Sequence, residues 1–218
     1  MILDEILMGK STEGALMSAY VANGKWNRYV YFLAGILGDE VDGVYVLQNL
    51  IEELAISLNI QELPIVIIPT FNIDGHTRLL PHNSYDIDLS NHFLAETQKN
   101  KFSQETLMLM NLCKKFPPSL CLNFTQGIPR ICYIGQDARF VGSHLSKYLG
   151  LEVLAEKQST NPEKISTYFQ NNFQAGTVNL YLPVSDEETR LKDIWNYMKY
   201  GLLKLFRNEY LKKYTLKT

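Results

Sequence analysis

The chain has 218 residues, of which 46% are hydrophobic and 20% charged, and its 21 basic and 23 acidic residues leave a formal net charge of −2. This ordinary globular composition excludes a disordered tail, a collagen-like fibre and a coiled-coil rod. Because there is no excess of positive charge for phosphate contacts, nucleic acid is not an expected partner. The length predicts a single domain, residues 1–218, with a core that needs no disulfides.

The cysteines and the first residues bear on the compartment. The three cysteines are Cys113, Cys121 and Cys132. Their odd number and lack of metal-ligand spacing predict buried thiols in a reducing compartment. Asp4 and Glu5 stand where a secretory signal is basic, and the longest apolar runs fall far below the roughly 20 residues of a membrane-spanning helix. We therefore expect a cytoplasmic protein without a transmembrane segment, with an unmarked export route as the alternative.

The first part of the chain is predicted to alternate strands and helices. Residues 15–22 and 28–36 have strand patterns, and the Asn-Gly turn at 23–24 predicts that they pair as a hairpin. Residues 41–58 repeat apolar side chains at three- and four-residue spacing, which is typical of an amphipathic helix. Residues 64–70 form a continuous apolar run, as expected of a strand covered on both faces. The last three segments predict a β-α-β unit with parallel strands and a right-handed crossover.

The alternation continues after a polar, irregular segment at residues 71–101, and loops of this length are usually functional or mobile. The predicted strands are residues 120–125, 132–134, 151–155 and 177–182. The predicted helices are residues 103–115, 137–149 and 162–172. A last helix is predicted to begin at the capping box at Ser185 and to end at about Tyr210. This order predicts an α/β fold, with a mixed, mostly parallel twisted sheet and helices on both faces. Sites in such folds lie at the carboxyl ends of the strands, here residues 35–40, 71–76, 125–130 and 181–183.

Several short segments carry a family resemblance. They read GKSTEG at 9–14, AGILGDE at 34–40, NIDG at 72–75, DIDLSNHF at 86–93 and YLP at 181–183. In this order they resemble motifs of the zinc metallocarboxypeptidase family, and most of all its small bacterial branch of murein-peptide amidases. The corresponding family motifs are Gly-Arg/Lys-Ser-x-x-Gly, the zinc loop Gly-x-His-Gly-x-Glu, Asn-Pro-Asp-Gly, Gly-Val-Asp-Leu-Asn-Arg-Asn-Phe and the segment after the catalytic strand. The resemblance covers most of the chain and implies a zinc carboxypeptidase-like fold.

The resemblance also implies a zinc cofactor, but the positions of its ligands hold other residues. The family binds zinc with a His and a Glu of the zinc loop and with a later His. These positions are Leu37, Glu40 and Thr125 here. A catalytic zinc normally has three protein ligands, and neither a leucine side chain nor a threonine hydroxyl is a suitable one. We therefore expect no cofactor.

The other catalytic positions implied by the resemblance are changed as well. The general base falls at Tyr181, whose phenol has an ordinary pKa of about 10 and is a poor base at neutral pH. The arginine that polarises the scissile carbonyl falls at Pro81. The Asn-Arg pair that binds the substrate carboxylate falls at Ser90 and Asn91, so the bidentate charge-assisted pairing is lost. The predicted degenerate pocket contains no catalytic residue and comprises Leu37, Glu40, Asp74, Pro81, Asn91, Thr125 and Tyr181.

Alternative roles stay open for the ionisable residues near this pocket. Three roles are open for Glu40: a relic metal ligand, an anchor for another cation, or a carboxylate near a helix N-terminus. We favour the third role, because the helix dipole stabilises a negative charge there. His76, His82 and His92 lie in the polar segment, and a rebuilt metal site of Glu40, His76 and His92 is a remote alternative. Their spacings of six and ten residues match no standard metal pattern.

The NIDG segment and Asp88 are expected to be structural. Asn and Asp side chains bond to the backbone in turns, and Gly75 is expected to provide a positive φ.

Three functions are compatible with these residues. The first is a pseudoenzyme that binds a peptide, a cell-wall fragment or a protein partner. The second is an active metallocarboxypeptidase or amidase that acts on murein peptides through a rebuilt, non-standard site. The third is a structural subunit that pairs with an active relative. The loss of the ligands, the base and the cationic groups favours the first.

Overall fold

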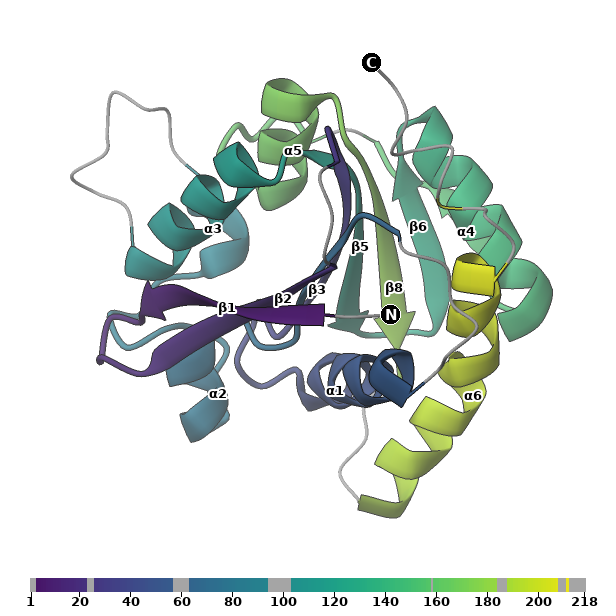
Figure 1. Cartoon of the computed structure of the whole chain (residues 1–218), viewed down its shortest axis with the longest axis horizontal. Coiled ribbons are helices and arrows are strands. Elements are labelled where there is room, and N and C mark those ends of the chain that lie inside the picture. The colour runs from purple at the N-terminus through teal and green to yellow at the C-terminus, as the bar shows by residue number, and fades with distance from the viewer. Residues whose placement is uncertain are drawn as a thin grey trace.

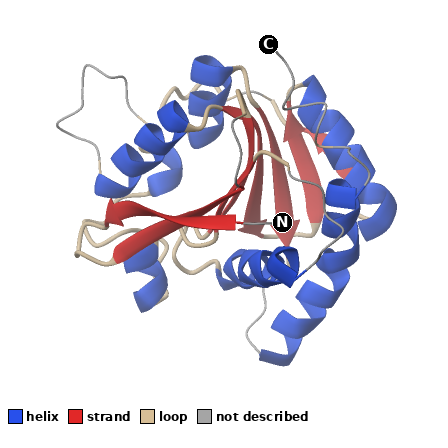
Figure 2. Cartoon of the chain, viewed as in Figure 1, coloured by secondary structure: helices blue, strands red, loops and turns tan. Residues whose placement is uncertain are grey.

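The computed structural model describes residues 3–22, 26–56, 63–93, 103–157, 159–183, 188–207 and 211. These residues form an eight-stranded sheet in the order β1-β2-β4-β3-β5-β8-β6-β7, with helices on both faces (Figures 1 and 2). The strands are β1 (Leu3–Lys10), β2 (Leu16–Ala22), β3 (Tyr29–Ala34), β4 (Ile65–Ile68), β5 (Pro118–Gln126), β6 (Arg130–Ile134), β7 (Val153–Ala155) and β8 (Gly176–Leu182). The helices are α1 (Val41–Ile56), α2 (Ile73–Arg78), the 3-10 turn η1 (Leu89–Asn91), α3 (Gln104–Lys115), α4 (Gln136–Leu149), α5 (Ile165–Phe173) and α6 (Glu188–Arg207).

The sheet is mixed and mostly parallel in its centre, which confirms the predicted fold class. Strands β4, β3, β5 and β8 are parallel neighbours, whereas β2 and β6 join this group in antiparallel fashion. The β3-α1-β4 unit has the predicted parallel pairing, with Phe32 opposite Ile67. One helix layer, α1, α4 and α6, covers one face, and α3 and α5 lie against the other face (Figure 1).

The predicted hairpin between residues 15–22 and 28–36 is wrong. Both strands form, but β4 lies between them, and Ile67 pairs with Tyr20 of β2 on one side and with Phe32 of β3 on the other. All four β4 residues are buried, so their backbone N–H and C=O groups need hydrogen-bond partners on both edges of the strand. The Asn-Gly turn at 23–24 lies outside the described residues. The hairpin partner of β2 is β1, which the sequence did not predict because its exposed, charged residues give no apolar alternation.

The polar segment 71–101 is more regular than predicted over its described part. The side chain of Asn72 accepts a hydrogen bond from the Gly75 N–H and caps the short helix α2. The side chain of Asp88 accepts from the Ser90 N–H and starts η1 in the same way. Local capping by Asn and Asp therefore provides structure that hydrophobic periodicity does not reveal.

The later helices agree closely with their predicted ranges. The Ser103 side chain accepts from the Thr106 N–H at the start of α3, and Gly150 ends α4 in the left-handed conformation. Helix α5 begins three residues later than predicted, at Ile165. The predicted capping box at Ser185 lies outside the described residues. Among the described helices, none is both long enough and apolar enough to cross a bilayer.

The core consists of two apolar clusters, one on each face of the sheet. Phe32, Leu122 and Leu180 meet α1, α4 and α6 on one face, and Tyr31 and Phe169 belong to the cluster on the other face. Each buried Leu or Phe of this kind contributes roughly 1.5–3 kcal/mol of transfer free energy. The two clusters hold the central strands in place, so the positions of their carboxyl ends are well defined.

The three cysteines are free and buried, as predicted. Burial raises the pKa of Cys113 to about 12 and raises the pKa of Cys121 further above its ordinary value. We expect neither thiol to react with a disulfide reagent in the native protein at pH 8, and both to react in denaturant. Thiol titration with and without guanidinium checks this, and rapid native labelling of Cys113 or Cys121 would contradict the described packing.

Candidate functional site

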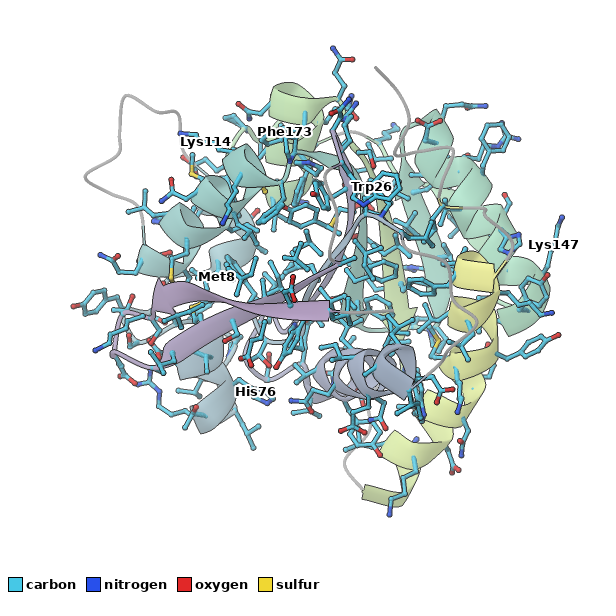
Figure 3. The ribbon with its side chains drawn as sticks, in the orientation of Figure 1. Met8, Trp26, His76, Lys114, Lys147 and Phe173 are labelled. Carbon is cyan, nitrogen blue, oxygen red and sulfur yellow. The ribbon has the colours of Figure 1, made fainter. Side chains whose placement is uncertain are left out.

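The predicted site segments meet at one end of the molecule because β3, β4, β5 and β8 are parallel. Backbone hydrogen bonds connect them: the Asn72 N–H donates to the Gly35 carbonyl at 2.7 Å, and the Gly127 N–H donates to the Leu182 carbonyl at 2.8 Å. Figure 3 shows His76 at this end, toward which the arrows of β5 and β8 point, whereas Phe173 lies at the opposite end. The sequence therefore correctly predicted which loops come together.

Two of the three predicted ligand positions are in direct contact. The Thr125 hydroxyl donates a hydrogen bond to Oε1 of Glu40, and the Gln126 backbone N–H donates to the same oxygen at 3.1 Å. Glu40 is only 5% exposed and stands just before α1. The contact joins the β3–α1 loop to the carboxyl end of β5.

A second buried carboxylate lies beside this contact. Asp42, in the first turn of α1, is fully buried, and its Oδ2 accepts a hydrogen bond from the side-chain amide of Gln126. Gln126 thus binds Asp42 with its side chain and Glu40 with its backbone N–H. The sequence prediction did not include Asp42 or Gln126. The available signal for Asp42 was its place on the same helix face as the apolar residues Val46 and Leu50.

Burial raises the pKa of Glu40 above its ordinary value. The hydrogen bonds from Thr125, Gln126 and Leu37 lower this pKa, and the nearby charge of Asp39 raises it, but burial is the largest effect. The Glu40 carboxylate is therefore held by neutral hydrogen-bond donors, and none of Thr125, Gln126 and Leu37 is a cation.

The residues at the ligand positions do not fit a catalytic zinc. Leu37 contributes a hydrocarbon side chain, and its carbonyl accepts from the Glu40 N–H at 3.2 Å. Thr125 contributes a hydroxyl that is already donated to Glu40. The ordinary zinc donors are imidazole, thiolate and carboxylate groups, and only one such group is present here. Across the residues that the structure describes, no group of three or more His, Cys, Asp or Glu side chains is arranged to hold a metal ion.

Tyr181 stands at the carboxyl end of β8, beside Thr125 in the β5–β8 register. The Arg130 guanidinium carbon lies 4.8 Å from the centre of the Tyr181 ring, a cation–π contact. Burial, together with the charge of Glu156 and Cys132, raises the pKa of Tyr181, and Arg130 only partly opposes this. A phenol with a raised pKa stays protonated at neutral pH, so it does not act as a general base for water.

Asp74 holds the β1–β2 turn against the loop after β4. This buried carboxylate accepts hydrogen bonds from the Ser11 hydroxyl at 2.6 Å, the Glu13 backbone N–H at 3.0 Å and the Ser84 hydroxyl at 3.3 Å. Arg78 adds an ion pair with Glu13 at 3.2 Å on the surface. The structural role expected for Asp74 is thus confirmed, because its hydrogen bonds tie GKSTEG to NIDG.

Pro81 lies in the loop after α2 and contacts the loop between β3 and α1. Its carbonyl accepts from the Gly38 N–H at 3.2 Å and from the Asn72 side-chain amide at 2.9 Å. The expectation of a positive φ at Gly75 is wrong, since Gly75 is not among the residues with positive φ. A glycine is required there for space: a Cβ at Gly75 would lie 2.5 Å from the Asn72 amide nitrogen and 2.6 Å from the His82 carbonyl oxygen.

Asn91 belongs to a local turn network. Its side-chain amide donates to Oδ2 of Asp88 at 2.7 Å, and the Ser90 N–H and hydroxyl donate to Oδ1 at 2.9 and 2.7 Å. Burial alone would raise the pKa of Asp88, but the hydrogen bonds from Ser90 and Asn91 outweigh it and lower the pKa. The structural role expected for Asp88 is thereby confirmed.

The loop histidines are engaged separately. His76 Nδ1 lies 3.2 Å from the Gly38 carbonyl oxygen, and His82 Nδ1 lies 2.7 Å from Asp86 Oδ1. In the described part of the chain, Glu40, His76 and His92 do not form a metal-holding group.

We expect Glu40→Gln to become more stable relative to the wild type as the pH rises. The pKa of Glu40 is higher in the folded than in the unfolded state. Its contribution to the free energy of unfolding is therefore full below about pH 4.3, the ordinary glutamate pKa, and is lost as the pH rises through the pKa of the folded state. Urea unfolding at pH 4.5 and pH 7.5 measures the difference. Glu52→Gln, at an exposed position of α1, is the matched control and should show no such trend. A Glu40→Gln difference that shrinks with pH would refute the assigned direction.

No family model matches the sequence, and no curated protein matches it. The structure is similar to the murein-tripeptide amidase from Escherichia coli O157, with a TM-score of 0.73 at 16% identity over 93% of this chain and 91% of that chain. It is similar to a putative carboxypeptidase A from Shewanella denitrificans, with a TM-score of 0.77 at 13% identity over 97% of this chain and 65% of that one. Carboxypeptidase A from Helicoverpa armigera gives a TM-score of 0.74 at 13% identity over 93% and 67% of the two chains. The chain therefore has the zinc metallocarboxypeptidase fold.

Proposed function

We propose that the chain is a pseudoenzyme of the metallocarboxypeptidase fold, which binds a peptide or cell-wall fragment without hydrolysing it. The proposal is supported by the similarity to a murein-tripeptide amidase over 91% of that chain, so the part of the fold that surrounds the site is present. The buried, free cysteines support a cytoplasmic location, where thiols stay reduced.

The observation that carries this proposal is the hydrogen bond between Thr125 and Glu40. In a hydrolytic site of this fold, these two positions would provide zinc ligands according to the resemblance described above. Here a hydroxyl and a backbone N–H satisfy the carboxylate, and Leu37 offers no donor in its side chain. Tyr181, with its raised pKa, replaces the expected general base. Glu40 is engaged by Thr125 and Gln126, and neither Leu37 nor Tyr181 offers a base for water at neutral pH.

A cavity beside Tyr181 supports the binding function. Its volume is about 370 Å³, and its lining is mainly apolar and aromatic. The lining residues are Pro129, Leu151, Tyr181, Leu182, Pro183, Arg190, Asp193, Ile194 and Tyr197. Cavities of this size that combine apolar walls with a few polar groups are typical ligand sites. We therefore expect the ligand to place an apolar or aromatic group next to Tyr181.

Calorimetry with a murein tripeptide, followed by mass spectrometry of the mixture, tests the proposal. We expect saturable binding and an unchanged tripeptide after incubation with and without added zinc. Tyr181→Ala should weaken binding, whereas Tyr200→Ala, at a position of α6 that is 57% exposed, should not. Cleavage that EDTA abolishes would instead establish a hydrolase with a rebuilt site, and absence of binding would overturn the ligand assignment.

A further inference from the structure

Helices α4 and α6 carry an excess of positive charge in a chain whose net charge is −2. Of the 21 basic and 23 acidic residues of the chain, these two helices contain seven basic and three acidic ones. The basic residues are Arg139, Lys147, Arg190, Lys192, Lys199, Lys204 and Arg207. The inner sides of both helices, with Val141 and Leu202, belong to the core, whereas the described basic side chains are exposed or half-buried. Lys199 forms an ion pair with Glu53 of α1 at 2.7 Å.

A close contact between α4 and α6 makes their outer sides one continuous surface. Gly201 of α6 stands against α4, where an added Cβ would lie 3.0 Å from a methyl carbon of Leu149. The Tyr197 hydroxyl donates a hydrogen bond to the Leu149 carbonyl and holds the two helices together. Figure 1 shows α4 and α6 side by side at the periphery of the molecule, so their outer sides form a convex surface.

Aromatic side chains connect the two helices on this surface. The rings of His144 and Tyr148 are in edge-to-face contact with 5.1 Å between their centres, and Tyr148 contacts Tyr200 of α6 in the same way at 5.5 Å. The Lys204 ammonium nitrogen lies 5.1 Å from the centre of the Tyr200 ring. Phe140, one turn before His144, is 48% exposed, and Tyr200 is 57% exposed. The α4–α6 surface is defined by Phe140, His144, Lys147, Tyr148, Tyr200 and Lys204.

The acidic residues of the two helices lie away from the point where the helices meet. Asp137 is in the first turn of α4, and Glu188 and Asp193 precede Gly201 by two turns or more. Figure 3 shows Lys147 on the outer side of α4, pointing away from the sheet. The middle of the α4–α6 surface therefore combines aromatic rings with positive charges.

This combination is complementary to the surface of a bilayer that contains anionic lipids. Such a surface attracts Lys and Arg side chains. Tyrosine, with an apolar ring and a polar hydroxyl, is favoured at the level of the lipid headgroups. A soluble polyanion would use the charges alone and gives no reason to expose Phe140. Nucleic acid single strands are bound in grooves, whereas the outer sides of α4 and α6 are convex.

We propose that the α4–α6 surface binds the protein peripherally to bilayers that contain anionic lipids. The rings of Phe140, Tyr148 and Tyr200 lie at the level of the headgroups, and Lys147 and Lys204 face the lipid anions. The inference is independent of the proposed function, because the candidate site lies at the carboxyl ends of the strands and not on the outer sides of these helices.

Co-sedimentation of the full chain with lipid vesicles tests the proposal. At about 0.15 M salt, we expect binding to equimolar phosphatidylserine and phosphatidylcholine, much weaker binding to phosphatidylcholine alone, and loss of binding as the salt concentration rises. Lys147→Gln combined with Lys204→Gln should weaken binding at least about tenfold, since one basic residue near an anionic surface contributes about fivefold. Lys10→Gln combined with Lys114→Gln removes an equal charge from exposed positions of β1 and α3 and should bind as the wild type does. Absence of binding to the mixed vesicles, or equal weakening in the two double variants, would overturn the proposal.

A tryptophan reporter tests which surface meets the bilayer. Relative to the wild type, the fluorescence of Phe140→Trp should shift to shorter wavelength when mixed vesicles are added, because the ring enters the headgroup region. Tyr85→Trp, at a position after α2 that is 72% exposed, should show no shift. A shift in Tyr85→Trp alone would contradict the assignment of the surface. Binding of an RNA oligonucleotide by the wild type, with the vesicles left unbound, would overturn the proposal in favour of a nucleic acid partner.

Discussion

Replacing Leu37 and Thr125 with histidine and Tyr181 with glutamate is expected to create a protein that binds stoichiometric zinc. Thr125 already contacts Glu40, and Leu37 lies on the same loop as Glu40, with its carbonyl bonded to the Glu40 N–H. Two imidazoles and one carboxylate from these positions would form a three-ligand set, as in catalytic zinc sites. Zinc titration with a competing chromophoric chelator measures the affinity, and circular dichroism establishes that the variant folds.

The matched control replaces Leu37 and Thr125 with alanine, which removes the same native side chains without adding donors. It should take up no zinc. A folded triple variant that takes up no metal even in excess would show that Leu37, Glu40 and Thr125 are not arranged as the resemblance implies.

Gly38→Ala is expected to lower the free energy of unfolding by about 3 kcal/mol or more, because it forces two loop backbones apart. A Cβ at Gly38 would lie 2.2 Å from the Gly75 carbonyl carbon and 2.4 Å from both the backbone nitrogen of His76 and the carbonyl oxygen of Leu80. Backbone atoms of this kind have no rotamer that relieves the overlap. Urea unfolding followed by circular dichroism measures the loss.

Gly142→Ala is the matched control for this prediction. Gly142 is an interior residue of α4, and its added Cβ would meet a methyl carbon of Ile131 at 3.1 Å. Alanine also gains roughly 1 kcal/mol of helix propensity over glycine, so little net change is expected. Similar stability losses in Gly38→Ala and Gly142→Ala would contradict the close packing described around Gly38.

The sequence predicted the central part of the fold because its signals there are local and strong. The apolar run of β4 and the periodic apolar face of α1 correctly predicted a β-α-β unit and, through it, the end of the sheet at which the site lies. The neighbour of β2 was not predictable in this way. Whether Tyr20 pairs with Phe32 or with Ile67 depends on long-range sheet order, and a local turn signal says nothing about it.

The candidate site was partly predictable for a similar reason. The resemblance correctly placed Glu40 and Thr125 close together, but it treated them as positions of lost ligands and did not predict their mutual hydrogen bond. The hydrogen bond between Asn179 and Glu156 was missed because it joins β8 to the residue after β7, across β6, and no local sequence signal indicates such a contact. The available signal was the alternation of polar and apolar residues along β8, which indicates that one face of this strand is not part of the core.

The most direct test of the pseudoenzyme proposal is the metal content of the native protein. Elemental analysis by mass spectrometry, on protein purified without chelators and dialysed against metal-free buffer, gives the number of zinc ions per chain. The donor set around Glu40 predicts zinc far below one ion per chain, with no change in Glu40→Ala. One zinc per chain in the wild type, lost in Glu40→Ala, would contradict the proposal.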